Sequence, residues 1–516
     1  MTQPTFTDED VQQMRALGIS PDEARRQLEL FQNPPEPVRL DRPARVGDGI
    51  VRLPEDSHGA LIQRFERAQG EGRISKLVPA SGAATRMFRD LTSYMVGETD
   101  ESEAVDRFFD RLEDFPFHAE LARVYEEIEG EPLDEAVPRG SRKDRVRILR
   151  ILLTDEGLGY ADMPKGLIPF HRYPTGSATP FEEHLVEASA YARDQNKMAR
   201  LHFTVAPEHE ERFRAVLGDV GEALGERLDC RFEVEFSSQS HATDTIAVDP
   251  DNQPFRLDDG TLLLRPGGHG ALLKNLEATR GDVVMIKNID NVVPNGRKDL
   301  VHWHKKVLGG YLLVIRDRAF GFLERLERDD ASGDPALLDE ATLFVRDSLQ
   351  RPLPDEWGSM DPETRRKWLV EALDRPLRAC GVVVNQGEPG GGPFWVRGDE
   401  GRLSLQIVEG SQVSDAEDQQ KIFASSTHFN PVDLACSLRN QWGEAYPLDV
   451  FVDPSTVFIA EKTHDGRPLK ALERPGLWNG AMAHWNTIFV EVPIETFAPV
   501  KTVLDLLRPE HQVGEG

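Results

Sequence analysis

A short apolar run that passes through small residues into a helical pattern is the sequence feature that most constrains the fold. Leu77-Val78 is the apolar run, residues 80–84 are small, and apolar side chains recur at helical spacing from Ala84 to Met95. A strand that turns in this way into a helix lets backbone N–H groups approach an anion, which the helix dipole also favours. Arg86 can add a guanidinium to phosphate oxygens. The pattern is equally typical of a structural strand–helix turn with an arginine on the helix surface.

The charge of the chain excludes one class of partner and makes its lysines informative. The 516 residues carry a formal net charge of −28, which argues against binding nucleic acid through a basic face. Only 14 of the 61 basic residues are lysines. An anionic substrate needs a locally positive pocket in so acidic a chain. The positions of the few lysines are therefore candidate parts of a site.

Several features favour a cytoplasmic protein. No run of 18 apolar residues predicts a membrane span, and the polar, acidic N-terminus is unlike a secretory signal. Cys230, Cys380 and Cys436 lie far apart without CxxC spacing, which favours reduced, structural cysteines.

Short apolar strands alternate with amphipathic helices through the middle of the chain. The sequence predicts a strand at 201–206, a helix at 208–217 and a strand at 232–236. This rhythm favours an α/β fold with a mixed, mostly parallel sheet and helices on both faces. In such sheets, ligands sit beyond the carboxyl ends of the strands. Further strands are predicted at 381–384, 403–408, 450–452, 456–460 and 487–492.

Three further motifs could contribute chemistry, and each also has a structural interpretation. Pro164 keeps the chain extended before Lys165, whose ammonium could reach a phosphate, although most lysines simply lie on the surface. The glycines of residues 267–270 would let the backbone approach a flat ligand. Asp290 ends a buried-type strand at 281–290, where its carboxylate could hold Mg²⁺ or cap the strand end.

His302 and His304 do not predict a zinc site. Their spacing of two places both side chains on one side only in a strand, whereas residues 299–307 show a helical pattern. The 14 histidines and three cysteines show no closed zinc-site spacing anywhere in the chain.

Taken in order, these motifs resemble the sugar nucleotidyltransferases, most closely the UDP-sugar pyrophosphorylase group. That family has a Gly-Gly-x-Gly-Thr-Arg/Ser-Met/Leu loop, Pro-Lys-Gly, a Pro-x-Gly-His/Asn-Gly loop, a strand ending in Val/Ile-Asp-Asn, and Phe-x-Pro-Val-Lys. The resemblance spans about residues 71–507, and the whole chain also resembles an uncharacterised bacterial family of unknown function. The matching segments are Ser81-Gly-Ala-Ala-Thr-Arg-Met87, Pro164-Lys-Gly166, Pro266-Gly-Gly-His-Gly270, Ile289-Asp-Asn291 and Phe497-Ala-Pro-Val-Lys501.

The resemblance implies a role for each motif. Arg86 would contact the leaving pyrophosphate, Lys165 the phosphates during transfer, and Lys501 the phosphate of the sugar substrate. Asp290 corresponds to the Mg²⁺ ligand. The other implied contacts are Ala80, Ser81, Gly82, Ala83, Ala84 and Thr85 with the triphosphate, Gln239 and Gly268 with uracil, His269 with nucleoside or sugar, and Glu409 and His428 with the sugar.

The chain departs from the family pattern in two places. Ser81, Ala83 and Ala84 replace family glycines. An alanine that must adopt φ > 0 costs on the order of 1 kcal/mol. In addition, residues 88–164 separate the loop from the Pro-Lys motif, where the family usually has a short link.

The function that the resemblance implies is a cytoplasmic sugar-1-phosphate nucleotidyltransferase. It would use Mg²⁺ and a nucleoside triphosphate, with UTP favoured, and release pyrophosphate. The sugar phosphate is already an anionic nucleophile, so the protein need only position the reactants and neutralise charge. Two alternatives stay open. One is a nucleotide-sugar-dependent glycosyltransferase, which would usually carry an Asp-x-Asp motif, and the other is a non-catalytic nucleotide or nucleotide-sugar binding protein.

The resemblance also implies an α/β fold of the nucleotide-diphospho-sugar transferase type, which is GT-A-like and Rossmann-like. Residues 1–70 predict an N-terminal helical region. Residues 71–330 would form the nucleotide-binding core, with a solvated, acidic helical insertion at 97–160. A second helical insertion is expected at 331–380, and residues 381–516 would complete the core on the sugar side.

Overall fold

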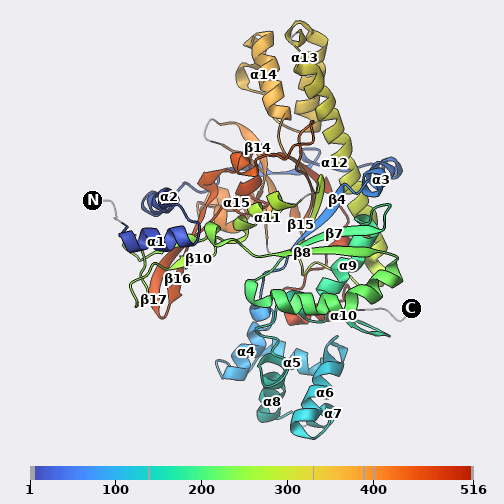
Figure 1. The fold of residues 1–516 in the computed structure, drawn as a ribbon, viewed down its shortest axis with the longest axis vertical. Coiled ribbons are helices and arrows are strands. Elements are labelled where there is room, and N and C mark those ends of the chain that lie inside the picture. Colours follow the sequence, from blue (N-terminus) through green and yellow to red (C-terminus); the bar gives the residue numbers. More distant parts are fainter. Residues whose placement is uncertain are drawn as a thin grey trace. The chain divides into compact units, whose positions relative to one another are not determined.

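The structure is a computed structural model that describes residues 6–137, 140–279, 281–328, 330–387, 390–398 and 401–512. The chain divides into two compact units. Unit 1 comprises Met1–Phe65, Ser238–Met285 and Val307–Val492, and unit 2 comprises Glu66–Ser237, Ile286–Lys306 and Pro493–Gly516. Three of the boundaries between the units fall within α3 (Glu55–Gly70), β11 (Val283–Lys287) and α12 (Lys298–Leu326). Figure 1 labels α3 and α12.

Unit 2 contains parallel strands and the helices that join them. Its strands β4, β7 and β8 are hydrogen-bonded in that order, and both pairs are parallel. A parallel pair needs a crossover connection, which α10 supplies between β7 and β8. This confirms the β–α–β pattern predicted for residues 201–236. The bounds are β4 (Ile74–Pro79), β5 (His171–Tyr173), β6 (Gly176–Ala178), α9 (Pro180–Tyr191), β7 (Met198–Thr204), α10 (Glu210–Leu228) and β8 (Arg231–Ser237).

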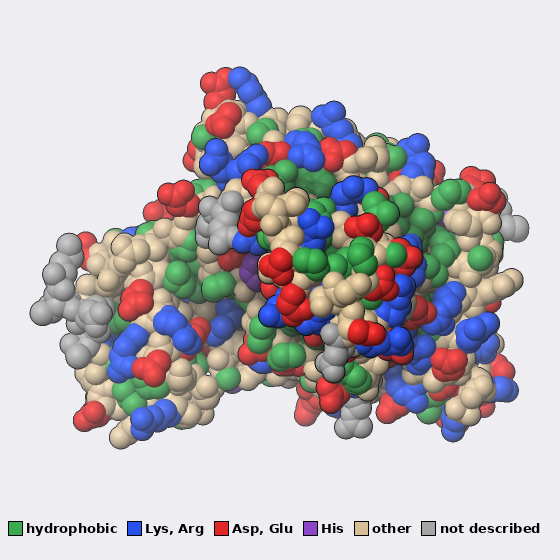
Figure 2. Space-filling view, turned by 90° about the horizontal axis from the view of Figure 1, so that it is seen from above, with side chains coloured by type: hydrophobic (Ala, Val, Ile, Leu, Met, Phe, Trp, Pro, Cys, Tyr) green, Lys and Arg blue, Asp and Glu red, His purple; other side chains and the backbone are tan. Residues whose placement is uncertain are grey.

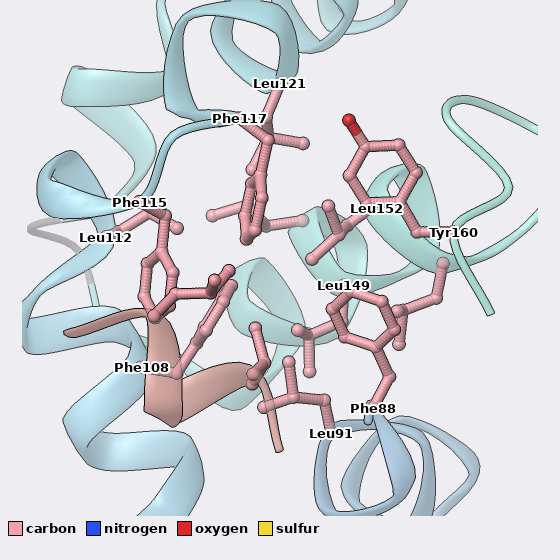
Figure 3. Packing of buried hydrophobic residues seen from close by; sticks show 14 of the residues in the cluster. Phe88, Leu91, Phe108, Leu112, Phe115, Phe117, Leu121, Leu149, Leu152 and Tyr160 are labelled. Carbon is pink, nitrogen blue, oxygen red and sulfur yellow. The ribbon is translucent and has the colours of Figure 1, made fainter. Parts of the chain in front are cut away.

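A helical insertion in unit 2 has an aromatic core of its own. Phe108, Phe115 and Phe117 point toward one another (Figure 3). The ring centroid of Phe115 lies 4.9 Å from that of Phe108 and 5.2 Å from that of Phe117. Phe88 and Tyr160 join the same buried cluster. The helices expected between residues 97 and 160 are present, and burial of these rings gives them a packed core beneath their exposed acidic side chains. It consists of α4 (Arg89–Val96), α5 (Glu103–Asp110), α6 (His118–Glu129), α7 (Leu133–Ala136) and α8 (Arg142–Leu153).

Unit 1 contains a mixed sheet. Its strands follow the order β2-β3-β18-β12-β15, in which β12 and β15 are antiparallel and the other neighbours are parallel. The predicted mixed and mostly parallel α/β character is therefore confirmed in this unit. The bounds are β2 (Arg45–Val46), β3 (Gly49–Val51), β12 (Leu377–Val384), β15 (His428–Ser437) and β18 (Asn486–Glu491).

Two sequence predictions about unit 1 are wrong. Strands occur between residues 40 and 51, in a region predicted to be helical, because strands of two to four residues are too short to produce a periodic pattern. Residues 450–452 are predicted to form a strand, but Leu448–Phe451 is a 3₁₀ turn. Asp453 follows it and accepts a hydrogen bond from the N–H of Ser455, at 2.9 Å, which favours turns over a strand.

Two smaller sheets and several helices complete unit 1. α13 and α14 lie side by side in Figure 1 and pack against each other. The smaller sheets have the orders β1-β13-β14 and β10-β9-β17-β16. The bounds are α1 (Asp8–Ala16), α2 (Pro21–Gln32), β1 (Leu40–Pro43), β9 (Thr245–Val248), β10 (Leu264–Arg265), α11 (Leu273–Ala278), α13 (Pro335–Leu343), α14 (Pro362–Leu373), β13 (Gly392–Arg397), β14 (Leu403–Val408), α15 (Glu417–Ala424), β16 (Phe458–His464) and β17 (Arg467–Glu473).

None of the helices in the described part of the chain is long and apolar enough to cross a membrane.

Candidate active site

The small-residue loop of unit 2 follows β4 in an unstrained conformation. β4 ends at Pro79, and Ala84–Arg86 form a 3₁₀ turn before α4 begins at Arg89, so the regular helix starts later than the sequence predicts. No residue between 80 and 86 has a positive φ, and Ala83 has φ −71° and ψ 156°. Any L-residue adopts these angles readily. The alanines that replace family glycines therefore impose no backbone strain here.

Replacing Ala83 with glycine is expected to lower the free energy of unfolding by about 0.4–1 kcal/mol, because glycine frees the unfolded chain without relieving strain in the folded loop. Urea denaturation of the two proteins measures this difference. An increase in stability would instead indicate that the loop adopts φ > 0 at this position.

The loop presents backbone donors that no other part of the described chain uses. The N–H groups of Ser81, Gly82, Ala83 and Thr85 have no acceptor among the described residues. Consecutive free N–H groups of this kind form a concave site for an anion. The guanidinium of Arg86, which is exposed, can add its charge to the same loop.

Backbone hydrogen bonds hold the Pro-Lys motif beside the loop despite the insertion between them. The N–H of Ala84 donates to the carbonyl of Met163 at 3.1 Å, and the N–H of Lys165 donates to the carbonyl of Gly82 at 3.2 Å. The chain therefore leaves the loop, forms helices α4–α8 and returns to the loop at residues 163–165. The long separation in sequence does not separate the two motifs in space.

Lys165, Asp290 and Lys501 meet at one point in unit 2. The ammonium of Lys165 lies 3.0 Å from Oδ2 of Asp290 and donates to the carbonyl of Val500 at 2.7 Å. The ammonium of Lys501 lies 3.4 Å from the same Oδ2. Burial would raise the pKa of Asp290, but attraction to Lys165 and then to Lys501 outweighs it and lowers that pKa. The carboxylate is therefore ionised at neutral pH and orients both ammonium groups.

The backbone around these side chains is also hydrogen-bonded. The N–H of Ile289 donates to the carbonyl of Pro79 at 3.3 Å, which joins the end of β11 to the end of β4. The N–H of Val500 donates to the carbonyl of Asp290 at 3.2 Å. Asp505 accepts hydrogen bonds from the N–H groups of Lys501 and Thr502, each at 2.7 Å. The strand end that carries Asp290 therefore has neighbours fixed on both sides.

A buried ionic network that sequence reasoning missed lies on the same strands. Glu187 of α9 accepts hydrogen bonds from Lys76 of β4 at 2.9 Å and from Lys287 of β11 at 2.7 Å, and all three side chains are buried. His184, one turn earlier, lies 3.2 Å from the carbonyls of both Asn288 and Ile289. A lysine inside each of two apolar strands was the available signal, since a lysine is almost never buried without a partner.

In unit 1, two of the predicted nucleoside and sugar positions, His269 and Glu409, meet at Trp478. The ring of His269 stacks on Trp478, with centroids 4.3 Å apart, and the indole N–H of Trp478 donates to Glu409 at 3.2 Å. The N–H of Leu477 donates to Nδ1 of His269 at 3.1 Å. Burial lowers the pKa of His269, which keeps the ring neutral. Trp478 is a member of this group that the sequence motifs did not indicate.

Gly268 is required by its surroundings. Its φ is +73°, and a Cβ there would lie 3.1 Å from Oε2 of Glu473.

The side chain of Gln239 leaves its buried Oε1 without a hydrogen-bond partner in the described chain. His428 makes other contacts, since Nε2 lies 3.3 Å from Glu491 and Nδ1 lies 2.9 Å from the hydroxyl of Thr427.

The fold and site together define a class of protein, namely a mixed α/β protein in which a loop of small residues after a strand lies next to a lysine–aspartate–lysine cluster. More particularly, the chain belongs to a family described as a domain of unknown function, DUF4301, whose model matches residues 7–512. No curated protein matches the chain.

Solved structures show only distant similarity. One is a uridine diphosphate N-acetylglucosamine pyrophosphorylase from Trypanosoma brucei, with 14% identity, 94% of this chain and 74% of that chain covered, and a TM-score of 0.44. Another is a UDP-glucose phosphorylase from the same organism, with 13% identity, 96% of this chain and 77% of that chain covered, and a TM-score of 0.44. The function is therefore inferred from the residues of this chain.

Proposed function

We propose that the protein is a sugar-1-phosphate nucleotidyltransferase of the cytoplasm, built on a GT-A-like nucleotide-diphospho-sugar transferase fold. It would join a nucleoside triphosphate, with UTP favoured, to a sugar-1-phosphate and release pyrophosphate. The observation that carries this proposal is the meeting of Lys165, Asp290 and Lys501 in the unit whose loop has N–H groups at residues 81–83 and 85 without an acceptor among the described residues. Such a site binds several phosphates at once, which a transfer between two phosphorylated substrates requires.

The roles of the side chains follow from the charge that develops during transfer. An oxygen of the sugar phosphate attacks the α-phosphorus as the bond to the leaving pyrophosphate breaks, and no proton need be removed from the nucleophile. Lys165 would neutralise the transferring phosphate, Arg86 the pyrophosphate, and Lys501 the sugar phosphate. Lys165 and Lys501 are held by Asp290 before substrate binds, so little reorganisation is needed.

Asp290 also suits a magnesium ion that arrives with the substrate. Both lysines contact its Oδ2, which leaves Oδ1 for a metal. Mg²⁺ is commonly bound by one or two carboxylates together with substrate phosphates and water. Among the described residues there is no group of three or more His, Cys, Asp or Glu side chains that could hold a metal alone. When bound, the ion would supply further neutralisation of phosphate charge.

The nucleoside and sugar contacts are proposed for unit 1. Gln239 has an unpaired buried acceptor that could take a hydrogen bond from a base, and Gly268 allows close approach of a flat ring. His269 and Glu409 would contact the sugar side together with Trp478, because the three already form one stacked and hydrogen-bonded group. His428 is a weaker candidate, since its ring nitrogens are occupied by Glu491 and Thr427.

The proposal is tested by identifying the products. The full-length protein is incubated with Mg²⁺, each of several nucleoside triphosphates and a panel of sugar-1-phosphates, and pyrophosphate release is measured. We expect release with UTP and at least one sugar phosphate. Release of a nucleoside diphosphate from a nucleotide-sugar would instead identify a glycosyltransferase. Binding at 100 times Kd, seen as about 2.7 kcal/mol of added stability without any turnover, would identify a non-catalytic binding protein.

A further inference from the structure

Unit 1 contains a hollow rich in arginine that no motif in the sequence indicates. It has a volume of about 710 Å³, and Arg351, Arg375 and Arg402 line it. The same three side chains also line an adjoining hollow of about 680 Å³. We call these three residues and the space between them the arginine hollow. Either volume lies within the range of small-molecule sites.

The charge of the arginine hollow is opposite to that of the chain. Basic and acidic side chains are interspersed on the face shown in Figure 2, and the whole sequence has 89 acidic and 61 basic residues. The first hollow, by contrast, is lined by five basic and two acidic side chains. They are Arg351, Arg366, Lys367, Arg375 and Arg402 against Glu371 and Asp374.

Acidic side chains neutralise part of this charge. Glu363 pairs with Arg366 at 2.8 Å and with Lys367 at 3.5 Å. Glu371 accepts a hydrogen bond from Arg375 at 3.0 Å, and Asp374 accepts one from the hydroxyl of Tyr446 at 2.9 Å. Arg375 also donates to the carbonyl of His484 at 3.0 Å, which fixes its guanidinium in the wall.

Arg351 has no direct partner. Within the described residues, its guanidinium has neither a hydrogen bond nor an ion pair. Burial lowers the pKa of Arg351 to about 10; repulsion from Arg375 and Arg402 adds to the shift, and attraction to Glu371 only partly opposes it. A charge held in this way is costly to the folded protein unless an anion neutralises it.

We propose that the arginine hollow is a second anion-binding site, for a small ligand that carries a phosphate group. Guanidinium groups form paired hydrogen bonds to phosphate oxygens, and partial burial strengthens the attraction. This site would be additional to the proposed nucleotidyl-transfer site, because it shares none of the residues assigned there.

Calorimetric titration with inorganic pyrophosphate tests the proposal. The titrated protein is the full chain with Lys165→Ala and Lys501→Ala, which weakens the proposed transfer site. We expect binding to persist in this double variant. Adding Arg351→Gln is expected to weaken it at least ~10-fold, since a hydrogen bond to a charged group is lost. Arg15→Gln, which removes an exposed arginine of α1, is the matched control and should leave the affinity unchanged.

Two results would overturn the proposal: absence of pyrophosphate binding in the double variant, or equal affinity with Arg351→Gln and Arg15→Gln. If Arg351→Gln does not fold, Arg402→Gln alters an exposed member of the hollow and is expected to weaken binding in the same way. Turnover by the unaltered protein reports separately on the proposed function. Pyrophosphate binding in the double variant, combined with no turnover by the unaltered protein, would therefore support the arginine hollow and contradict the transferase.

Discussion

Replacing Lys165 with alanine is expected to lower turnover at least ~100-fold, the size of effect seen when one group that stabilises transition-state charge is removed. Lys165 is mostly buried at the cluster, with its ammonium 3.0 Å from Asp290 and 2.7 Å from the carbonyl of Val500. Water that filled the space left by the ammonium would carry no positive charge and would not be fixed in position. Initial rates of pyrophosphate release with the two proteins measure the change.

The matched control is Lys143→Ala, which removes an exposed lysine of α8 and should leave turnover unchanged. Circular dichroism and thermal melting of both variants check that each remains folded. Near wild-type turnover in Lys165→Ala would remove this residue from the site. The nucleotidyltransferase assignment would then lose the residue on which it depends most.

Replacing Glu187 with glutamine is expected to lower the free energy of unfolding by about 3–5 kcal/mol, because it leaves buried charge uncompensated. Lys76 and Lys287 both donate to Glu187, and none of the three side chains is accessible to water. Glutamine keeps the size of the side chain but not its charge. Urea denaturation at neutral pH measures the loss.

Glu417→Gln is the matched control for this prediction. Its ion pair with Lys421 is exposed on α15, and its loss should cost no more than about 0.5 kcal/mol. A similarly small cost for Glu187→Gln would show that the buried lysines are neutral or hydrated.

The stabilisation from Glu187 should also depend on pH. Burial would raise the pKa of Glu187, but Lys287 and Lys76 hold it well below the ordinary value of 4.5. Since the folded-state pKa is the lower one, the unfolded chain takes up the proton first on acidification. The stabilisation is therefore present above pH 4.5 and is lost as the pH falls through the folded-state pKa.

The local elements near the candidate site could be predicted well. The strand before Ala80 and the strand before Asp290 were each visible as an apolar run with a recognisable end, and the structure contains β4 and β11 there. Lys165 and Asp290 were visible from the Pro-Lys pair and the strand end, whereas Lys501 was indicated only by the resemblance to the sugar nucleotidyltransferases.

Other features could not be predicted, for identifiable reasons. The network of Lys76, Glu187 and Lys287 joins residues on three elements. A lysine within each apolar strand signals a buried charge, but nothing local shows that both lysines meet Glu187. The arginine hollow likewise depends on Arg351, Arg375 and Arg402 coming together from separate segments. The strain expected from alanines in the loop did not occur, since φ at Ala83 depends on how residues 163–165 pair with the loop.

By itself the sequence determined the strand–helix–strand pattern of residues 201–236, the acidic character of the chain and the motifs that resemble a sugar nucleotidyltransferase. The reason is that periodicity, turn residues and short motifs act over a few residues. Only the tertiary structure decided that Lys165, Asp290 and Lys501 meet, that His269 stacks on Trp478, and which charges are buried together. Those outcomes depend on contacts between residues far apart in the chain, and their electrostatic energies are set by burial, which a linear pattern does not contain.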